Sequence, residues 1–356
     1  MTDPSNGNME TVSMLEKNNI TEQWRNNSEE NSIYAWRKSS FSQLIYEHIP
    51  SLTYNYVEKH IFLNKLVKNN IIKRESDVRL TEKNGIIRKN DVSIEKQQGT
   101  LRVVVLGDSV SAALPLVLMG QAPYTVILET LLNNNKAAFN AQQIEVLNFA
   151  VDGYTTDQEA YLLETKVGKF QPDMIILQYC LNDPVLSYTP AIWFLEHKNP
   201  PSYLLDFVLR RLDIHSSLLS TLNPSHPYYG LGKNYWDRIH QDSSKSWKSV
   251  VGGFAKISSY SKNIPVLLVI SPLLIDENDI NKETQNLTKI YSKVKGLGQA
   301  NGFSILELRE ELSKYKASQL KRTQDDTIHY NELGHQVVAE TIFKTIKEKQ
   351  LLYQQQ

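Results

Sequence analysis

Four short segments of this chain carry residues able to perform nucleophilic chemistry on a carbonyl group. They are Gly107-Asp108-Ser109, Asp152-Gly153-Tyr154, Leu181-Asn182-Asp183 and Asp326-Thr327-Ile328-His329. An aspartate three residues before a histidine can accept a hydrogen bond from Nδ1. That leaves Nε2 free to act as base toward a serine hydroxyl. An asparagine amide and backbone N–H groups beside a glycine can stabilise an oxyanion.

Each segment alone has an ordinary structural explanation, as a helix cap, a turn glycine, an Asx turn or a surface ion pair. Their place relative to the elements of the fold favours chemistry instead. Apolar, β-branched runs predict buried strands at 101–107, 144–151, 174–180, 265–271 and 303–308. Apolar residues at helical spacing predict helices at 123–133, 155–168, 281–296 and 333–348.

Strands that alternate with helices predict a parallel sheet of the α/β class. Ligands of such sheets bind at the carboxyl ends of the strands, near the point where the strand order reverses. The four segments follow the first, second, third and fifth predicted strands. We therefore expect them to meet at one edge of the sheet.

In order and position, these segments resemble the SGNH (GDSL) hydrolase family, in its longer bacterial type. The resemblance implies a three-layer α/β/α, flavodoxin-like fold with a parallel five-stranded sheet. It implies Ser109 as nucleophile, His329 as general base and Asp326 as the residue that orients His329. The implied oxyanion hole consists of the N–H groups of Ser109 and Gly153 and the side chain of Asn182.

The family also implies a substrate and the absence of a cofactor. The substrate is a small-molecule, lipid or sugar ester, cleaved without metal: a carboxylic ester, a thioester or an O-acetyl group. The chain departs from the family at Ala113, Ala150 and Cys180, where glycine is frequent. Each of these residues adds a Cβ near the pocket, and the added atoms are expected to limit how wide a substrate can enter.

A second Asp-x-x-His match, Asp237-Arg238-Ile239-His240, lies in a stretch that reads as helical. There, aspartate and histidine are neighbours on a helix surface, and we expect an exposed contact of little energetic worth. His335 is a further histidine, predicted to lie within the last helix. Because His329 follows a predicted strand, its position favours it over both His240 and His335 as the general base.

Other classes of function are less well supported. An acyltransferase that uses the same serine cannot be told from a hydrolase by sequence, and a non-catalytic module would usually lack a triad residue. The α/β-hydrolase fold is excluded because the chain has no G-x-S-x-G elbow. Cys180 ends an apolar strand, where a cysteine is usually an inert hydrophobe.

Composition argues against nucleic acid and a membrane-spanning segment. Lys+Arg and Asp+Glu both number 39 among the 356 residues, so there is no basic footprint for nucleic acid. No signal peptide and no apolar run of about 20 residues, the length that spans a bilayer, is seen. Together with the single cysteine, this predicts a cytoplasmic protein. The sequence does not indicate the oligomeric state.

The predicted organisation has three parts. Residues 1–31 are polar and predicted to be a disordered tail, and 32–99 are an N-terminal extension and lead-in. Within the extension, residues 32–72 are predicted to form helices that pack on the main domain. Residues 100–350 form the predicted hydrolase domain, with an aromatic insert at 184–250 that is either a lid over the crevice or a packing excursion.

Overall fold

The computed structural model describes residues 34–38, 44–48, 80–88, 90–184, 235–275, 286–324 and 326–352. At its centre is a parallel five-stranded sheet with the order β4-β3-β5-β6-β7. The strands are β3 Thr100–Leu106, β4 Gln143–Asn148, β5 Met174–Tyr179, β6 Val266–Ile270 and β7 Ser304–Glu307. This is the flavodoxin-like strand order, so the predicted fold class and all five predicted strands are confirmed.

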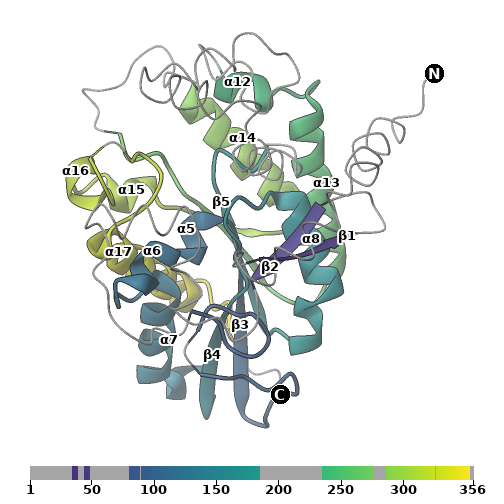
Figure 1. The fold of residues 1–356 in the computed structure, drawn as a ribbon, viewed down its shortest axis with the longest axis vertical. Coiled ribbons are helices and arrows are strands. Elements are labelled where there is room, and N and C mark those ends of the chain that lie inside the picture. Colours follow the sequence, from purple (N-terminus) through teal and green to yellow (C-terminus); the bar gives the residue numbers. More distant parts are fainter. Residues whose placement is uncertain are drawn as a thin grey trace, which may run out of the picture.

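Helices cover both faces of the sheet (Figure 1). On one face lie α7 (Tyr124–Asn134) and α17 (Glu332–Glu348), and on the other lie α8 (Thr156–Thr165), α13 (Lys245–Tyr260) and α14 (Leu287–Ala300). The shorter helices are α5 Ser109–Ala112, α6 Leu114–Leu118, α12 Tyr235–Ile239, α15 Arg309–Leu312, α16 Ala317–Leu320, and the 3-10 turns η1 Lys136–Phe139 and η2 Val167–Phe170. None of the helices in the described ranges is long and apolar enough to cross a membrane.

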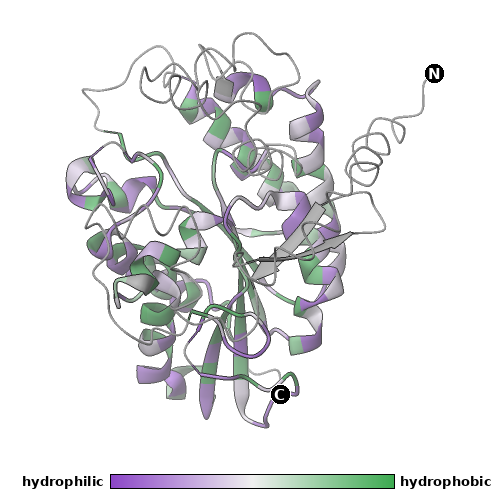
Figure 2. Ribbon diagram, viewed as in Figure 1, coloured by the Kyte–Doolittle hydropathy of each residue, from purple (hydrophilic) through white to green (hydrophobic). Residues whose placement is uncertain are grey.

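Alternate residues of each strand enter two separate cores. In β3, Val103 and Val105 pack in the cluster that includes α7 and α17, whereas Val104 and Leu106 pack in the cluster that includes α8, α13 and α14. All four side chains are fully buried. In Figure 2 the helices, like β4 at the edge of the sheet, carry both colours. Burial on both faces explains why β3, β5 and β6 read as largely apolar runs.

The extension differs from its prediction in two short segments. Within residues 32–72, where helices were expected, the structure has two strands, β1 (Tyr34–Lys38) and β2 (Leu44–His48), paired antiparallel. The sequences YAWRK and LIYEH are rich in aromatic and β-branched residues, which favour strands. In these two segments the aromatic and aliphatic residues therefore belong to strands and not to helices. The rest of 32–72, and the predicted tail 1–31, lie outside the described residues.

Helix α13 was not predicted, and its first residues were assigned to the insert. It supplies the crossover between β5 and β6. Gly252 and Gly253 lie in its middle and weaken the helical signal. A Cβ on Gly253 would come within 2.9 Å of the backbone and side chain of Thr156 in α8, so this glycine permits the two helices to pack closely. Residues 185–234 of the insert, which include Trp193 and Phe194, lie outside the described part of the chain.

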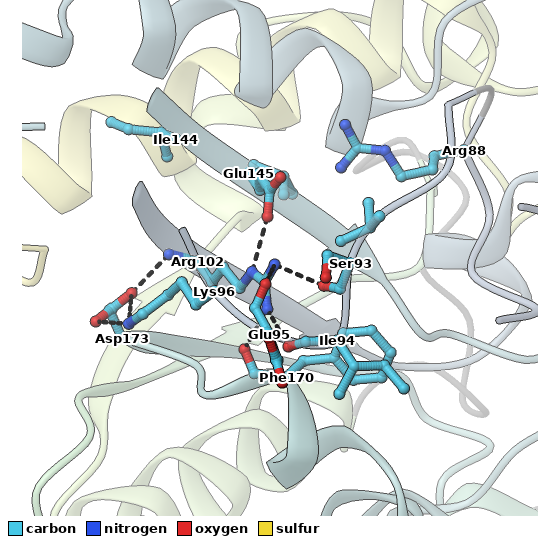
Figure 3. Close-up of polar contacts among 12 residues, drawn as sticks. Arg88, Ser93, Ile94, Glu95, Lys96, Arg102, Ile144, Glu145, Phe170 and Asp173 are labelled. Atoms are coloured by element: carbon cyan, nitrogen blue, oxygen red, sulfur yellow. Dashed lines mark hydrogen bonds and ion pairs between the residues drawn. The ribbon is translucent and has the colours of Figure 1, made fainter. Parts of the chain in front are cut away.

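Arg102 fastens the lead-in segment to the sheet at the end remote from the serine (Figure 3). Its guanidinium is buried and donates to the backbone oxygens of Ser93 (2.7 Å), Ile94 (2.8 Å) and Phe170 (2.9 Å). It also pairs with Glu145 of β4, with 2.7 Å between Nε and Oε2. A single side chain thus satisfies acceptors from three separate segments.

Replacing Arg102 with methionine should therefore lower the melting temperature substantially. Loss of the guanidinium leaves the Glu145 carboxylate and three carbonyls without their donor. Breaking a buried pair costs about 3 kcal/mol or more, roughly 5–10 °C in a domain of this size. Calorimetry on Arg102→Met and on Lys314→Met checks this, because Lys314 pairs with Glu311 in an exposed position. Equal, small shifts for both variants would show that Arg102 does not anchor the lead-in.

Candidate active site

Ser109 stands at the first position of α5, directly after β3 and the turn Gly107-Asp108. The carboxylate of Asp108 caps this helix by accepting from the N–H of Val110 (2.9 Å). Gly107 has no room for a side chain, because a Cβ there would lie 2.7 Å from Oε1 of Gln178. The turn is therefore compact, and it leaves Ser109 partly exposed at the carboxyl end of the strand.

The structure brings Ser109, His329 and Asp326 together. Oγ of Ser109 lies 2.8 Å from Nε2 of His329, and Nδ1 of His329 lies 3.0 and 3.1 Å from the two carboxylate oxygens of Asp326. Asp326 and His329 belong to the loop between α16 and α17. These three residues are the ones that the sequence selected, and their spacing matches that of a nucleophile, a base and a group that orients the base.

Asp326 remains charged in this setting. Burial alone would raise its pKa, but the hydrogen bonds and charge of His329, together with the charge of Arg322, hold the pKa well below its usual range. Its Oδ1 also accepts from the backbone N–H groups of Ile328 (3.0 Å) and His329 (2.9 Å). An ionised carboxylate accepts only, so Nδ1 carries the proton and Nε2 is left to accept from Ser109.

The residues expected to hold an oxyanion follow three adjacent strands, β4, β3 and β5. Gly153 adopts a positive φ of 73° after β4, and the preceding Val151 donates its N–H to Gly107 O (3.1 Å). Asn182, after β5, donates from Nδ2 to Oδ2 of Asp108 (2.9 Å). Both segments are thus tied to the two residues that precede Ser109. This bond uses one of the two N–H groups of the Asn182 amide.

The two other candidate histidines, His240 and His335, lie in the core. His240 was expected to make an exposed contact with Asp237, and this was wrong. It is buried, its Nε2 lies 2.8 Å from the hydroxyl of Tyr179 and its Nδ1 lies 2.7 Å from the carbonyl of Trp236. Burial lowers the pKa of His240 to about 4 and that of His335, in α17, to about 3. Both are neutral side chains near neutral pH.

Residues 105–337 match the model of the GDSL-like lipase/acylhydrolase family. The match covers well over half of the chain and includes the serine and histidine described above. The chain belongs to this family. It is accordingly an ester-hydrolysing enzyme, as the resemblance had implied.

Solved structures with related folds share little sequence with this GDSL-like hydrolase. The acetyl xylan esterase AlAXEase is 16% identical, with 69% of this chain and 100% of that chain covered and a TM-score of 0.44. Axe2, an acetylxylan esterase from Geobacillus stearothermophilus, is 13% identical, with 69% and 94% covered and a TM-score of 0.43. The lipase/acylhydrolase from Enterococcus faecalis is 15% identical, with 70% and 96% covered and a TM-score of 0.38. Values this low carry no information on the substrate. No curated protein matches the sequence.

Two departures from the family's usual glycines now have a structural context. Ala113 separates α5 from α6 with a φ of 48°, a left-handed conformation that costs a non-glycine residue about 1 kcal/mol or more. The glycine frequent at this position in the GDSL-like family would avoid that cost. Cys180 is buried, and burial together with the negative charges of Asp108 and Asp183 raises the pKa of its thiol well above its usual value. It is therefore a neutral thiol, not a nucleophile.

Gln178 holds the serine turn of this GDSL-like hydrolase through hydrogen bonds to its residues. It was not among the residues expected from the sequence. It is buried in β5, and its Oε1 accepts from the Oγ of Ser111 (3.2 Å) and the N–H of Asp108 (3.4 Å). Its Nε2 donates to the Oγ of Ser271 (3.2 Å), which follows β6. A polar residue inside the apolar run MIILQYC was the signal that could have found it.

A cluster of buried carboxyl groups lies behind the serine turn. Asp183 accepts from the N–H of Cys180 (2.9 Å) and from the hydroxyl of Thr156 (2.7 Å). Glu159 of α8 is fully buried, yet neither of its oxygens has a hydrogen-bond partner among the described residues. Burial, then the negative charges of Asp183 and Asp108, raise the pKa of Glu159 well above its usual value. Glu159 is therefore the member of the cluster best placed to hold a proton.

Glu159→Gln should stabilise the enzyme increasingly as the pH rises. In the unfolded chain, glutamate loses its proton near pH 4.5, whereas the folded protein keeps Glu159 protonated to higher pH. Above that pH, folding carries a cost of about 1.4 kcal/mol per unit of upward pKa shift, and glutamine removes it.

Melting temperatures of wild type and Glu159→Gln between pH 4.5 and 8 test this prediction. The exposed residue Glu310 offers a matched control, since Glu310→Gln should leave the pH dependence of the melting temperature unchanged. A loss of stability in Glu159→Gln that is the same at every pH would contradict the prediction.

Proposed function

We propose that this GDSL-like hydrolase cleaves its ester through a covalent acyl-enzyme on Ser109. The observation that carries the proposal is the 2.8 Å approach of Ser109 Oγ to Nε2 of His329, whose Nδ1 is held by the ionised Asp326. A serine hydroxyl is a weak nucleophile unless a base takes its proton as it attacks, and His329 is within reach to do so.

In the first half of the reaction, Oγ of Ser109 attacks the acyl carbon and its proton passes to Nε2 of His329. The carbonyl oxygen becomes an oxyanion, which accepts from the N–H groups of Ser109 and Gly153 and from the Asn182 amide. Collapse of this intermediate breaks the bond to the leaving alcohol or thiol, which takes the proton from His329. The acyl group stays on Ser109.

In the second half, water attacks the acyl carbon while His329 accepts its proton. The new oxyanion is held by the same donors, and its collapse releases the acid and returns the proton to Ser109. Throughout both halves, Asp326 stays ionised and stabilises the imidazolium that forms twice per cycle.

The proposed substrate is a small-molecule, lipid or sugar ester, and water is the proposed acceptor. An alcohol or sugar that displaced water in the second half would make the same site an acyltransferase. Product analysis with a model ester, in the presence and absence of added alcohols or sugars, separates the two activities.

Ser109→Ala and His329→Ala should each lower kcat by several orders of magnitude, and the double variant should lose little more. Nucleophile and base act as one unit, so removing the second after the first has a small further effect. Steady-state kinetics with p-nitrophenyl acetate provides the measurement. Wild-type turnover in either single variant would refute the assignment.

Asn182→Ala should lower kcat about 10²–10³-fold with little change in KM, because its donor acts on charge that develops in the transition state. The same kinetics, combined with a melting curve, checks this. A change confined to KM would assign Asn182 to substrate binding instead. A fall in melting temperature with unchanged kcat would limit its role to the bond with Asp108.

A further inference from the structure

The loop that carries Asp326 and His329 is closed at its base by Arg322. The backbone N–H of Arg322 donates to the carbonyl of His329 (3.0 Å), and Lys321 and Tyr330 form an antiparallel bridge. The side chain of Arg322 then turns back over the same loop toward Asp326. The residue is therefore fixed both by its main chain and by its side chain.

The guanidinium of Arg322 grips one oxygen of the Asp326 carboxylate. Its Nη2 lies 2.8 Å from Oδ2, and the two side chains are 16% and 11% exposed. Oδ1 already accepts from two backbone N–H groups, whereas Oδ2 has, among the described residues, His329 Nδ1 (3.0 Å) as its one partner besides Arg322. Without Arg322, this half of the carboxylate would be held by the reacting histidine alone.

The charge of Arg322 also acts on the pair. Among the described residues, the ionisable groups whose pKa values respond to the charge of His329 include Asp326, Asp108 and His335, and Arg322 pairs with the first of them. His335 is neutral near pH 7, because burial and then the positive charges of His329 and Arg322 lower its pKa to about 3. Burial raises the pKa of Asp108. Arg322, which pairs with Asp326, thus places a permanent positive charge beside these groups.

We propose that Arg322 is a positioning residue for ester hydrolysis, which acts through Asp326 on His329. Its guanidinium holds Oδ2 of the carboxylate that orients the imidazole, and its positive charge favours the ionised form of that carboxylate. The enzyme consequently keeps Asp326 ionised, and the imidazole oriented, to more acidic pH than it would without Arg322. This inference rests on the proposed role of His329 as general base.

The test is the pH dependence of kcat/KM for p-nitrophenyl acetate. In Arg322→Gln, we expect the acid limb to move to higher pH by roughly half to one unit, because a cation close to a partly buried pair is lost. The limiting kcat/KM should also fall several-fold, as Asp326 becomes less well fixed. Arg322→Lys should keep the acid limb near its wild-type position while the limiting value still falls, because lysine supplies the charge on a more flexible side chain.

The Arg88–Glu129 ion pair gives a matched control. Its side chains are similarly buried, at 14% and 28% exposed, and it joins the lead-in segment to α7 away from the triad. Arg88→Gln should therefore lower the melting temperature without moving the acid limb. If Arg322→Gln fails to give a cooperative melting curve, Arg322→Met carries the same expectation with a more apolar side chain.

The outcomes separate this inference from the proposed function. An acid limb at the wild-type pH in a folded Arg322→Gln or Arg322→Met, with Ser109→Ala inactive, would overturn the role of Arg322 alone. A similar shift in Arg88→Gln would also overturn it, since the effect would then be unspecific. Full activity in Ser109→Ala would instead refute the proposed function.

Discussion

The hydrogen bond between Ser109 and His329 joins residues that are 220 positions apart in the chain. No local preference can bring such residues to 2.8 Å, so the contact depends on the parallel sheet. All five strands run in the same direction, and their carboxyl ends therefore open at one edge. With β4 and β5 on either side of β3, the serine turn emerges where the strand order reverses, which is where α/β sheets place their ligands.

Hydrogen bonds between neighbouring loops position the residues at this edge more closely than strand pairing alone does. Val151 is bonded to Gly107 and Asn182 to Asp108, so the candidate oxyanion donors are fixed relative to the serine turn. On the other side, the N–H of Leu274, after β6, donates to the carbonyl of Thr327 in the histidine loop (2.8 Å). A site built on rigid elements and held by such second contacts keeps its geometry with little reorganisation during the reaction.

The same edge carries a cost in stability. Asp108 and Asp183 are buried with hydrogen-bond partners, but Glu159 is buried without any. Desolvating three carboxyl groups near one another favours protonation of at least one of them. The strained Ala113, immediately after the serine helix, adds a further small cost. Local costs of this kind are common beside reacting groups, where geometry outweighs stability.

Much of the fold could be predicted because β3, β5 and β6 are buried on both faces and therefore give short, largely apolar runs in the sequence. The positions of Ser109, Asp326 and His329 followed from the strand ends. Features that depend on long-range packing could not be predicted. Two glycines weaken the helical pattern of α13, and one of them, Gly253, permits its close contact with α8. The buried position of His240 depends on Tyr179, which lies 61 positions earlier in the chain.

The central claim, a covalent acyl-enzyme on Ser109, is tested most directly by intact-protein mass spectrometry after reaction with a fluorophosphonate probe. The account predicts one adduct per chain, located on Ser109 by peptide mapping, and no adduct in Ser109→Ala. Labelling should slow strongly in His329→Ala, since the hydroxyl loses its base. An adduct on another residue, or equal labelling of Ser109→Ala, would contradict the account.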